Sequence, residues 1–226
     1  LFILLLMTTI GFTTDRTSSY KELIPQVVPP ENLERFTLGY RLPLADSLWI
    51  RVLQNADFCE NPRGDKAYNP AILVDDVVKY KMRPSRCHEG WVYKLMDKIT
   101  DLDPLFRIVY SQGATILSVG VDDREGARLI FDKGVENYPN DWIILYRASY
   151  HYLFEVQDKV KAAELMVRAS KQPGAPFFLP SLAARLYSLD GQAELGRQVL
   201  VEYLKDNPTG GGAARAKWRL EQIDAE

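Results

Sequence analysis

Two histidines and two cysteines are the side chains in this sequence best suited to catalysis or metal binding. They are His88, His151, Cys59 and Cys87. Neither histidine has a serine or cysteine partner placed in a recognisable triad order, which nucleophilic catalysis would use. His151 stands between Tyr150 and Tyr152, a setting typical of a core or groove-lining histidine. We therefore expect no catalytic residue.

The two cysteines flank a segment that contains proline and charged residues. A disulfide between Cys59 and Cys87 is expected if the body of the chain lies outside the cytoplasm, where redox conditions permit it. It would close a loop of about 27 residues and stabilise the fold by about 3 kcal/mol in the loop-entropy model. Two unpaired thiols are the alternative. A metal site with His88 lacks a fourth ligand and the C-x-x-C spacing, so we expect no metal.

Pairs of acidic residues could serve as glycosidase carboxylates, but here they fall at turns and helix starts. The pairs are Asp75 with Asp76, Asp101 with Asp103, and Asp122 with Asp123. Asp122 or Asp123 suits a helix N-cap, which contributes about 1 kcal/mol. The glycine-rich stretch TGGGAARAK lacks the spacing of a phosphate-binding loop. We expect neither a cofactor nor a small-molecule substrate.

Composition places the chain among globular proteins. Its 226 residues are 46% apolar and 26% charged, with a net charge of −2. This length allows one sizeable core or a short array of repeats. The absence of a basic excess argues against a nucleic-acid partner.

The first residues are almost wholly apolar and read LFILLLMTTIGF. Because a membrane-spanning helix needs about 20 such residues, we interpret residues 1–14 as an incomplete transmembrane anchor. A hydrophobic helix packed on protein and an uncleaved signal segment are the alternatives. Residues 15–42 contain Pro25, Pro29 and Pro30, which favour an extended linker, with a short helix in ENLERFTLG.

From residue 43 onwards the sequence consists of amphipathic helical patterns with a repeat. The stretch GARLIFDKGVENYP has Ala127, Phe131, Gly134 and Pro139 at intervals of 4, 3 and 5. The same intervals lead back from Pro208 and from Pro104, and a further copy starts at Ala162. The copies start at residues 92, 127, 162 and 196, which lie 35, 35 and 34 residues apart. Generic helices would not keep one period in this way.

This pattern resembles the tetratricopeptide repeat family, in which each unit of about 34 residues is a helix pair. Gly113, Ser149 and Ala184 occupy the position where the family has a small residue in the first helix of each unit. Relative to the family pattern, one unit has two extra residues at VGVDD, and the next has one extra residue in the turn before Asp158. The stretches GYRLPLADSLWIRVLQ and ITDLDPLFRIVY are also similar to membrane-anchored bacterial members. The resemblance implies an all-α, right-handed superhelix of about four helix pairs.

The domain boundaries follow from this interpretation. The repeat domain spans residues 43–208, with an insertion at 60–88. Residues 209–226 form a capping helix, in which we expect Trp218 and Ile223 to face inward. We expect the TGGG stretch before it to be a flexible break.

The resemblance also implies a binding groove lined by the first helix of each pair. The groove candidates are Tyr110, Ile143, Tyr146, Tyr150, Ser181 and Arg185. Packing of several of these between repeats is the alternative. Tyrosines would offer broad contacts with a polar tip, as in many binding hot spots.

These features together predict a non-catalytic, membrane-anchored scaffold or adaptor in a cell-envelope complex. The alternative is an accessory or regulatory subunit of a membrane enzyme or of a transport or motility machine, held mainly through its N-terminal helix. The expected partners are other protein subunits and the membrane. The expected location is the bacterial inner membrane, with a single span and a periplasmic repeat domain.

Overall fold

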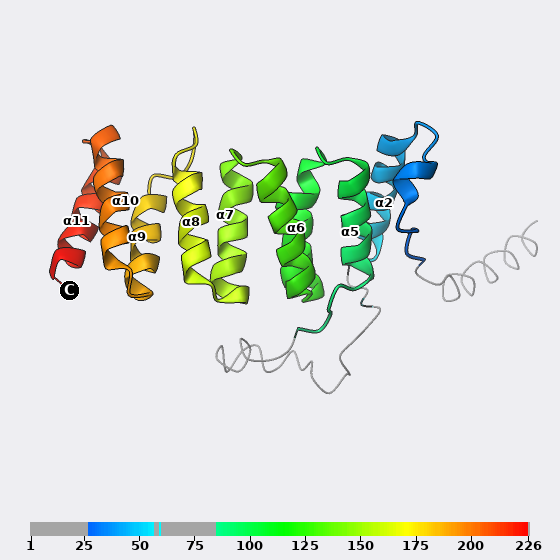
Figure 1. Cartoon of the computed structure of the whole chain (residues 1–226), viewed down its shortest axis with the longest axis horizontal. Helices are drawn as coiled ribbons and strands as arrows, with labels where there is room; N and C mark the ends of the chain where they lie inside the picture. The colour runs from blue at the N-terminus through cyan, green and yellow to red at the C-terminus, as the bar shows by residue number, and fades with distance from the viewer. Residues whose placement is uncertain (1–26, 57–58, 60–84, 226) are drawn as a thin grey trace, which may run out of the picture.

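The computed structural model describes residues 27–56, 59 and 85–225, and every regular element within these residues is helical. The described chain is therefore all-α, as predicted. In Figure 1 the helices stand side by side in a row that runs from α2 to α11. The elements are η1 (Leu33–Phe36), α2 (Arg41–Gln54), α5 (Trp91–Leu102), η2 (Val109–Gly113), η3 (Ile116–Val121), α6 (Arg124–Asn137), α7 (Trp142–His151), η4 (Tyr152–Val156), α8 (Lys159–Ser170), α9 (Leu179–Leu189), α10 (Ala193–Asp206) and α11 (Gly211–Ala225).

The described helices pack as four consecutive pairs, each with a first helix that we call helix A and a second that we call helix B. Helix A is α2 in the first pair, residues 107–121 with η2 and η3 in the second, α7 continued by η4 in the third, and α9 in the fourth. Helix B is α5, α6, α8 and α10 in the same order. The last helix, α11, packs on α9 and α10.

The positions that define the repeat are buried. The first position of each copy is occupied by Val92, Ala127, Ala162 and Gly196, and the large residue four places on is Met96, Phe131, Met166 or Leu200. Small residues let the two helices of a pair approach closely. A Cβ atom on Gly196 would lie 2.7 Å from the carbonyl oxygen of Ala184, so α9 and α10 meet at a distance that only glycine permits.

The extra residues of the second and third repeats lie inside the helices and not in the turns, where we expected them. The second helix A contains two π-helical segments, η2 and η3, and the third contains one, η4. A π-helical turn accommodates one residue more than an α-helical turn. The two extra residues of the second repeat are thus absorbed by η2 and η3, and the one extra residue of the third repeat is absorbed by η4. The helices keep their length in space, and the pairs can still stack.

The end of helix A has the same backbone form in the last three pairs. Asp122, Gln157 and Gly191 have φ angles of 58°, 65° and 77°, in the left-handed region, and lie 35 and 34 residues apart. The next N–H donates back into helix A, to the carbonyl of Leu117, Tyr152 or Tyr187 at 2.8, 2.9 and 2.8 Å. The repeat period therefore reappears in the backbone conformation of the turns.

The two ends of the described row differ from the sequence-based expectation in detail. The helix that we expected to start at Pro43 starts at Arg41. At the other end, α11 already begins at Gly211, so the TGGG stretch is partly helical and not a break. Ile223 is buried as predicted, but Trp218 is 58% exposed. The helical spacing explains this, because Ala216 and Ile223 share the inner face seven residues apart, which turns Trp218 outward.

Some predicted segments lie outside the described residues, namely the anchor at residues 1–14, much of the 15–42 linker and most of the 60–88 insertion. Within the described part, no helix combines the length and the apolar character needed to cross a bilayer.

Candidate protein-binding face

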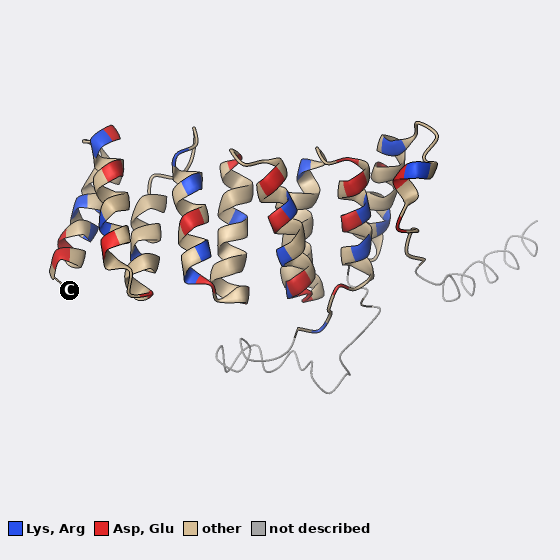
Figure 2. Ribbon diagram, in the orientation of Figure 1, with Lys and Arg blue, Asp and Glu red and all other residues tan. Residues whose placement is uncertain are grey.

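Helices A and helices B form two sides of the row with different chemistry. On one side, Trp49 of α2 packs on Phe106, just before the second helix A, and Tyr146 of α7 packs on Phe178, the N-cap residue of α9. On the other side, Lys133 of α6 pairs with Asp101 of α5, which joins two neighbouring helices B. Figure 2 shows charged residues along α5, α6, α8 and α10, whereas α7 and α9 carry almost none. We call the two sides the helix-A face and the helix-B face.

The helix-A face leaves large apolar side chains exposed. Its exposed apolar residues on the second, third and fourth pairs are Ile108, Val119, Tyr150, Phe154, Val156, Phe177 and Leu189. Isolated exposed apolar residues are normal on proteins, whereas a contiguous group marks an interaction surface, and of these residues Val119, Tyr150 and Phe154 line one common hollow.

A hollow of about 630 Å³ lies within this face, between the second and third helices A. Most of its walls are aromatic or aliphatic, and we call it the aromatic hollow. It is lined by Thr115, Ser118, Val119, Phe131, Tyr146, Arg147, Tyr150, His151, Phe154 and Glu155. Its volume falls within the range of protein sites that accept a few side chains or a small ligand.

One wall of the aromatic hollow is a ladder of rings along α7 and η4. Tyr146, Tyr150 and Phe154 are four residues apart, so they lie above one another on one side of the helix. The ring centroids of Tyr146 and Tyr150 are 4.9 Å apart, and those of Tyr150 and Phe154 are 5.3 Å apart. These ring contacts hold the wall in a fixed shape, because such edge-on and tilted packing is favourable.

The polar base of the aromatic hollow is the pair Ser118 and His151. The Ser118 hydroxyl lies 3.0 Å from His151 Nδ1, and His151 Nε2 lies 3.0 Å from the carbonyl oxygen of Arg124. Because a carbonyl only accepts, Nε2 carries the ring proton and Nδ1 accepts from Ser118. Burial lowers the pKa of His151 to about 4, and the hydrogen bond to Arg124 opposes this only in part. The ring is therefore neutral at pH 7.

His151 joins three elements through these bonds. Its ring connects η3, which carries Ser118, to the start of α6 at Arg124 and to its own helix α7. The Arg124 side chain lies 3.0 Å from Glu155 and 3.4 Å from Asp122, which ties the end of η4 to the turn after η3. On the neighbouring side, Arg147 donates to the carbonyl of Ser111 at 2.7 Å. These polar groups around the hollow are thus engaged within the chain, while the rings of Tyr150 and Phe154 remain partly exposed.

The structure places the predicted groove residues in different surroundings. Tyr146 and Tyr150 line the aromatic hollow, and Arg185 is exposed on α9. Ile143 lies at the start of α7 and faces a different, shallow hollow with Arg107 and Tyr138. The prediction is wrong for the remaining two, because Ser181 is 6% exposed and Tyr110 is fully buried.

Tyr110 is an internal packing residue for clear physical reasons. Its hydroxyl donates to the carbonyl of Pro104 at 3.1 Å, and its ring packs on Tyr138. It also fills the space left by Gly134, where an added Cβ would come within 2.8 Å of the Tyr110 side chain.

Sequence reasoning missed Thr115, Val119, Phe131 and Phe154 as lining residues of the hollow. Thr115 lies 35 residues before Tyr150, so the repeat period itself points to it. That signal was hidden because the extra residues were assigned to the turn after the helix. The extra residues lie within η2 and η3, so the residues on the exposed side of this helix differ by one position from those that we predicted.

The helix-B face contains ion pairs that link neighbouring repeats. Lys133 on α6 lies 2.9 Å from Asp101 on α5 and also binds Asp97. Partial burial disfavours the charge of Lys133, but its hydrogen bonds to Asp97 and Asp101 prevail and raise its pKa. Burial alone would raise the pKa of Asp101, but the hydrogen bonds from Lys133 and Lys98 prevail and hold that pKa below its usual value.

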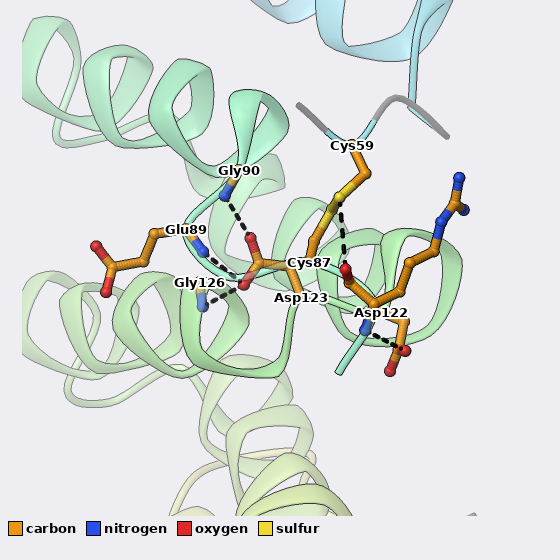
Figure 3. The surroundings of a disulfide bond; sticks show 8 residues. Cys59, Cys87, Glu89, Gly90, Asp122, Asp123 and Gly126 are labelled. Atoms are coloured by element: carbon orange, nitrogen blue, oxygen red, sulfur yellow. Dashed lines mark hydrogen bonds between the residues drawn. A yellow bond between two sulfur atoms is a disulfide. The ribbon is translucent and has the colours of Figure 1, made fainter. Parts of the chain in front are cut away.

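A disulfide holds the chain next to the turn that joins the two helices of the second pair (Figure 3). The structure joins Cys59 and Cys87, whose Cα atoms are 5.9 Å apart. Two backbone groups hold this region to the turn, since Cys87 N donates to Asp122 O at 3.1 Å and Arg86 N donates to Asp122 Oδ2 at 2.7 Å. The end of the 60–88 insertion is thereby attached to the repeats.

Asp123 beside this disulfide serves two helices at once. Its fully buried carboxylate accepts from Gly126 N at 2.9 Å, which caps α6 as predicted. It also accepts from Gly90 N at 2.8 Å and from Glu89 N at 3.1 Å, at the start of α5 (Figure 3). A negative charge at two helix N-termini is stabilised by both helix dipoles. We call Cys59, Cys87, Asp122 and Asp123 the disulfide corner.

No group of histidine, cysteine, aspartate and glutamate side chains in the described ranges could hold a metal ion. Comparison of the chain with models of protein families, with curated proteins and with solved structures finds no match. Its function must therefore be inferred from its own residues and geometry.

Proposed function

We propose that this chain is a membrane-anchored scaffold or adaptor that binds another protein of a cell-envelope complex through its helix-A face. The aromatic hollow is the observation that carries the proposal. It offers a rigid wall of partly exposed rings on the helix-A face, whereas the helix-B face carries ion pairs within the chain, such as Lys133 with Asp101. Apolar pockets with a few polar groups are the usual anchoring points for side chains of a partner.

The proposal includes a tetratricopeptide-like architecture, in which about four helix pairs form a right-handed superhelix. Three features support it, namely the 35-residue period, the burial of the repeat positions and the recurring left-handed turn residues. In such arrays each repeat packs on its neighbours, and one face stays open along the whole row.

We further propose an inner-membrane location in a bacterium, with one span and the repeats in the periplasm. The apolar sequence of residues 1–12 supports an anchor. The disulfide between Cys59 and Cys87 supports an oxidising compartment, because such bonds rarely persist in the cytoplasm.

An accessory or regulatory subunit of a membrane enzyme, or of a transport or motility machine, is the second candidate. The same apolar N-terminal sequence favours it, because a hydrophobic helix can carry the main contact within the bilayer.

Affinity capture separates the two candidates. The full chain and a chain starting at residue 27 are expressed with the same tag, and bound proteins are identified after mild cross-linking. If the helix-A face binds the partner, both chains retain it. If the shorter chain stays folded by circular dichroism and loses the partner, the second candidate is correct.

A further inference from the structure

The turn between η1 and α2, together with the last residue of η1 and the first two of α2, exposes an unusual number of large apolar side chains. Within the seven residues from 36 to 42, Phe36, Leu38, Tyr40 and Leu42 are 72%, 91%, 70% and 59% exposed. We call these residues the 36–42 loop. A cluster of this kind costs solvation free energy in water, so it marks a contact with something outside the described chain.

The exposure is produced by the backbone of the loop. Leu38 and Gly39 have φ angles of 48° and 91°, so two successive residues are left-handed. A leucine rarely adopts this conformation, which glycine or asparagine takes with little strain. The strain places the Leu38 side chain at the apex of the turn, away from the helices.

Internal contacts hold the loop in this shape. Tyr40 N donates to Thr37 O at 2.8 Å, and the Thr37 hydroxyl donates to Glu34 O at 3.3 Å. The Arg41 guanidinium donates to the carbonyl of Asp101 on α5 at 3.0 Å, which fixes the base of the loop to the repeats. The apolar side chains are therefore presented on a supported turn.

We propose that the 36–42 loop inserts into the interfacial region of a lipid bilayer, the one that holds the N-terminal anchor. The proposal rests on the anchor in the proposed function. Residues 13–26 separate the apolar run from the described chain, and 14 residues reach at most about 50 Å, so the start of the described chain stays within about 50 Å of that membrane. The loop also lies at the end of the helix row from which the chain leads back to the anchor (Figure 1).

The chemistry of the loop fits this interface better than it fits a protein groove. The loop projects outward as an apex with its apolar side chains exposed, a shape that can enter the headgroup region of a bilayer without a preformed hollow. Phenylalanine, tyrosine and leucine are the residues that partition into the boundary between headgroups and acyl chains, with the tyrosine hydroxyl in the polar layer.

Charge makes the proposal more specific. Residues 31–42 contain Glu31 and Glu34 against Arg35 and Arg41, so their formal charges cancel. The contact should therefore depend on apolar burial and not on anionic lipids, and it should persist at high salt. A second attachment of this kind would fix the angle between the helix row and the membrane.

Depth-dependent quenching tests this in the full chain. The chain is reconstituted into phosphatidylcholine vesicles, with a fluorophore on a cysteine introduced by Leu38→Cys and the native disulfide left oxidised. We expect nitroxide-labelled lipid to quench most of this signal, in low and in high salt alike. The matched control is Trp218→Cys, an exposed apolar position on α11 at the other end of the row, which should not be quenched. Tyr40→Cys, labelled in the same way, repeats the test if Leu38→Cys folds poorly.

A fourth label, at Met7→Cys, distinguishes failure of this inference from failure of the anchor. If the label at residue 7 is quenched and those at 38 and 40 behave like the label at 218, the loop does not enter the bilayer and the inference is overturned while the anchor stands. An unquenched label at residue 7 overturns the anchor. A label at 38 that is shielded from aqueous iodide but not reached by lipid nitroxide shows that protein covers the loop, which also overturns the inference.

Discussion

The helix-A face and the helix-B face are built from the same repeats, yet they treat their side chains in opposite ways. On the helix-B face and at the disulfide corner, charged groups find partners within the chain, as Lys133 does with Asp101 and Asp123 does with three backbone N–H groups. On the helix-A face, the rings of Tyr150 and Phe154 remain 41% and 44% exposed. The polar side thus holds the repeats together, and the apolar side carries the surface to which we propose a partner binds.

The comparison predicts that substitutions at buried polar groups cost stability, and the largest cost is expected for Asp123→Ala. This change leaves the N–H groups of Glu89, Gly90 and Gly126 without their acceptor and removes a link between two helices. We expect the free energy of unfolding to fall by about 3 kcal/mol in urea titrations.

Asp158→Ala is the matched control, because Asp158 caps α8 through one bond, to Lys161 N, and is exposed. It should cost about 1 kcal/mol. Equal losses for the two variants would show that the shared role of Asp123 is unimportant.

Lowering the pH should weaken the contacts below the aromatic hollow. The pKa of His151 is about 4 in the folded chain and 6.5 in the unfolded chain, so between these values the unfolded chain binds more protons. Stability is therefore lost as the pH falls from 6.5 towards 4, by about 2 kcal/mol between pH 7 and pH 5.

Urea titrations at pH 7 and pH 5 measure this loss. His151→Gln should reduce the difference between the two pH values, whatever its effect on stability at pH 7. An unchanged difference in this variant would assign the pH dependence to other groups.

The ion pair between helices B should contribute a smaller amount. Lys133→Met removes the bonds to Asp97 and Asp101, but the lysine side chain is one-third exposed, so solvent reduces the effect to about 1 kcal/mol. Lys171→Met breaks a more exposed pair with Glu202 and should leave the melting temperature nearly unchanged. Both pairs join helices B of neighbouring repeats and differ in exposure, so equal destabilisation of the two variants would show that partial burial does not decide the value of these pairs.

The sequence predicted the parts of the fold that depend on spacing. Burial at Ala127, Ala162 and Gly196 follows directly from a period near 35, because equivalent positions in stacked units meet equivalent neighbours. The cap of α6 at Asp123 was also visible, since a short acidic residue before an amphipathic helix is a local signal.

Long-range contacts and helix register could not be obtained in this way. The bonds from Asp123 to Glu89 and Gly90 connect residues more than 30 positions apart, and no pattern announces them. An insertion reads the same in sequence whether it lengthens a turn or forms a π-helical segment. For that reason the hollow residues Thr115 and Phe154 were missed and Tyr110 was wrongly placed on the surface.

The most direct test of the central claim measures binding and stability together for the double variant Tyr150→Ala, Phe154→Ala in the full chain. These rings are 41% and 44% exposed, so we expect a melting temperature close to that of the original chain and a loss of partner capture of about tenfold or more. Trp218→Ala, which removes an exposed ring from α11, should change neither. Undiminished capture by the folded double variant would show that the aromatic hollow is not where the partner binds.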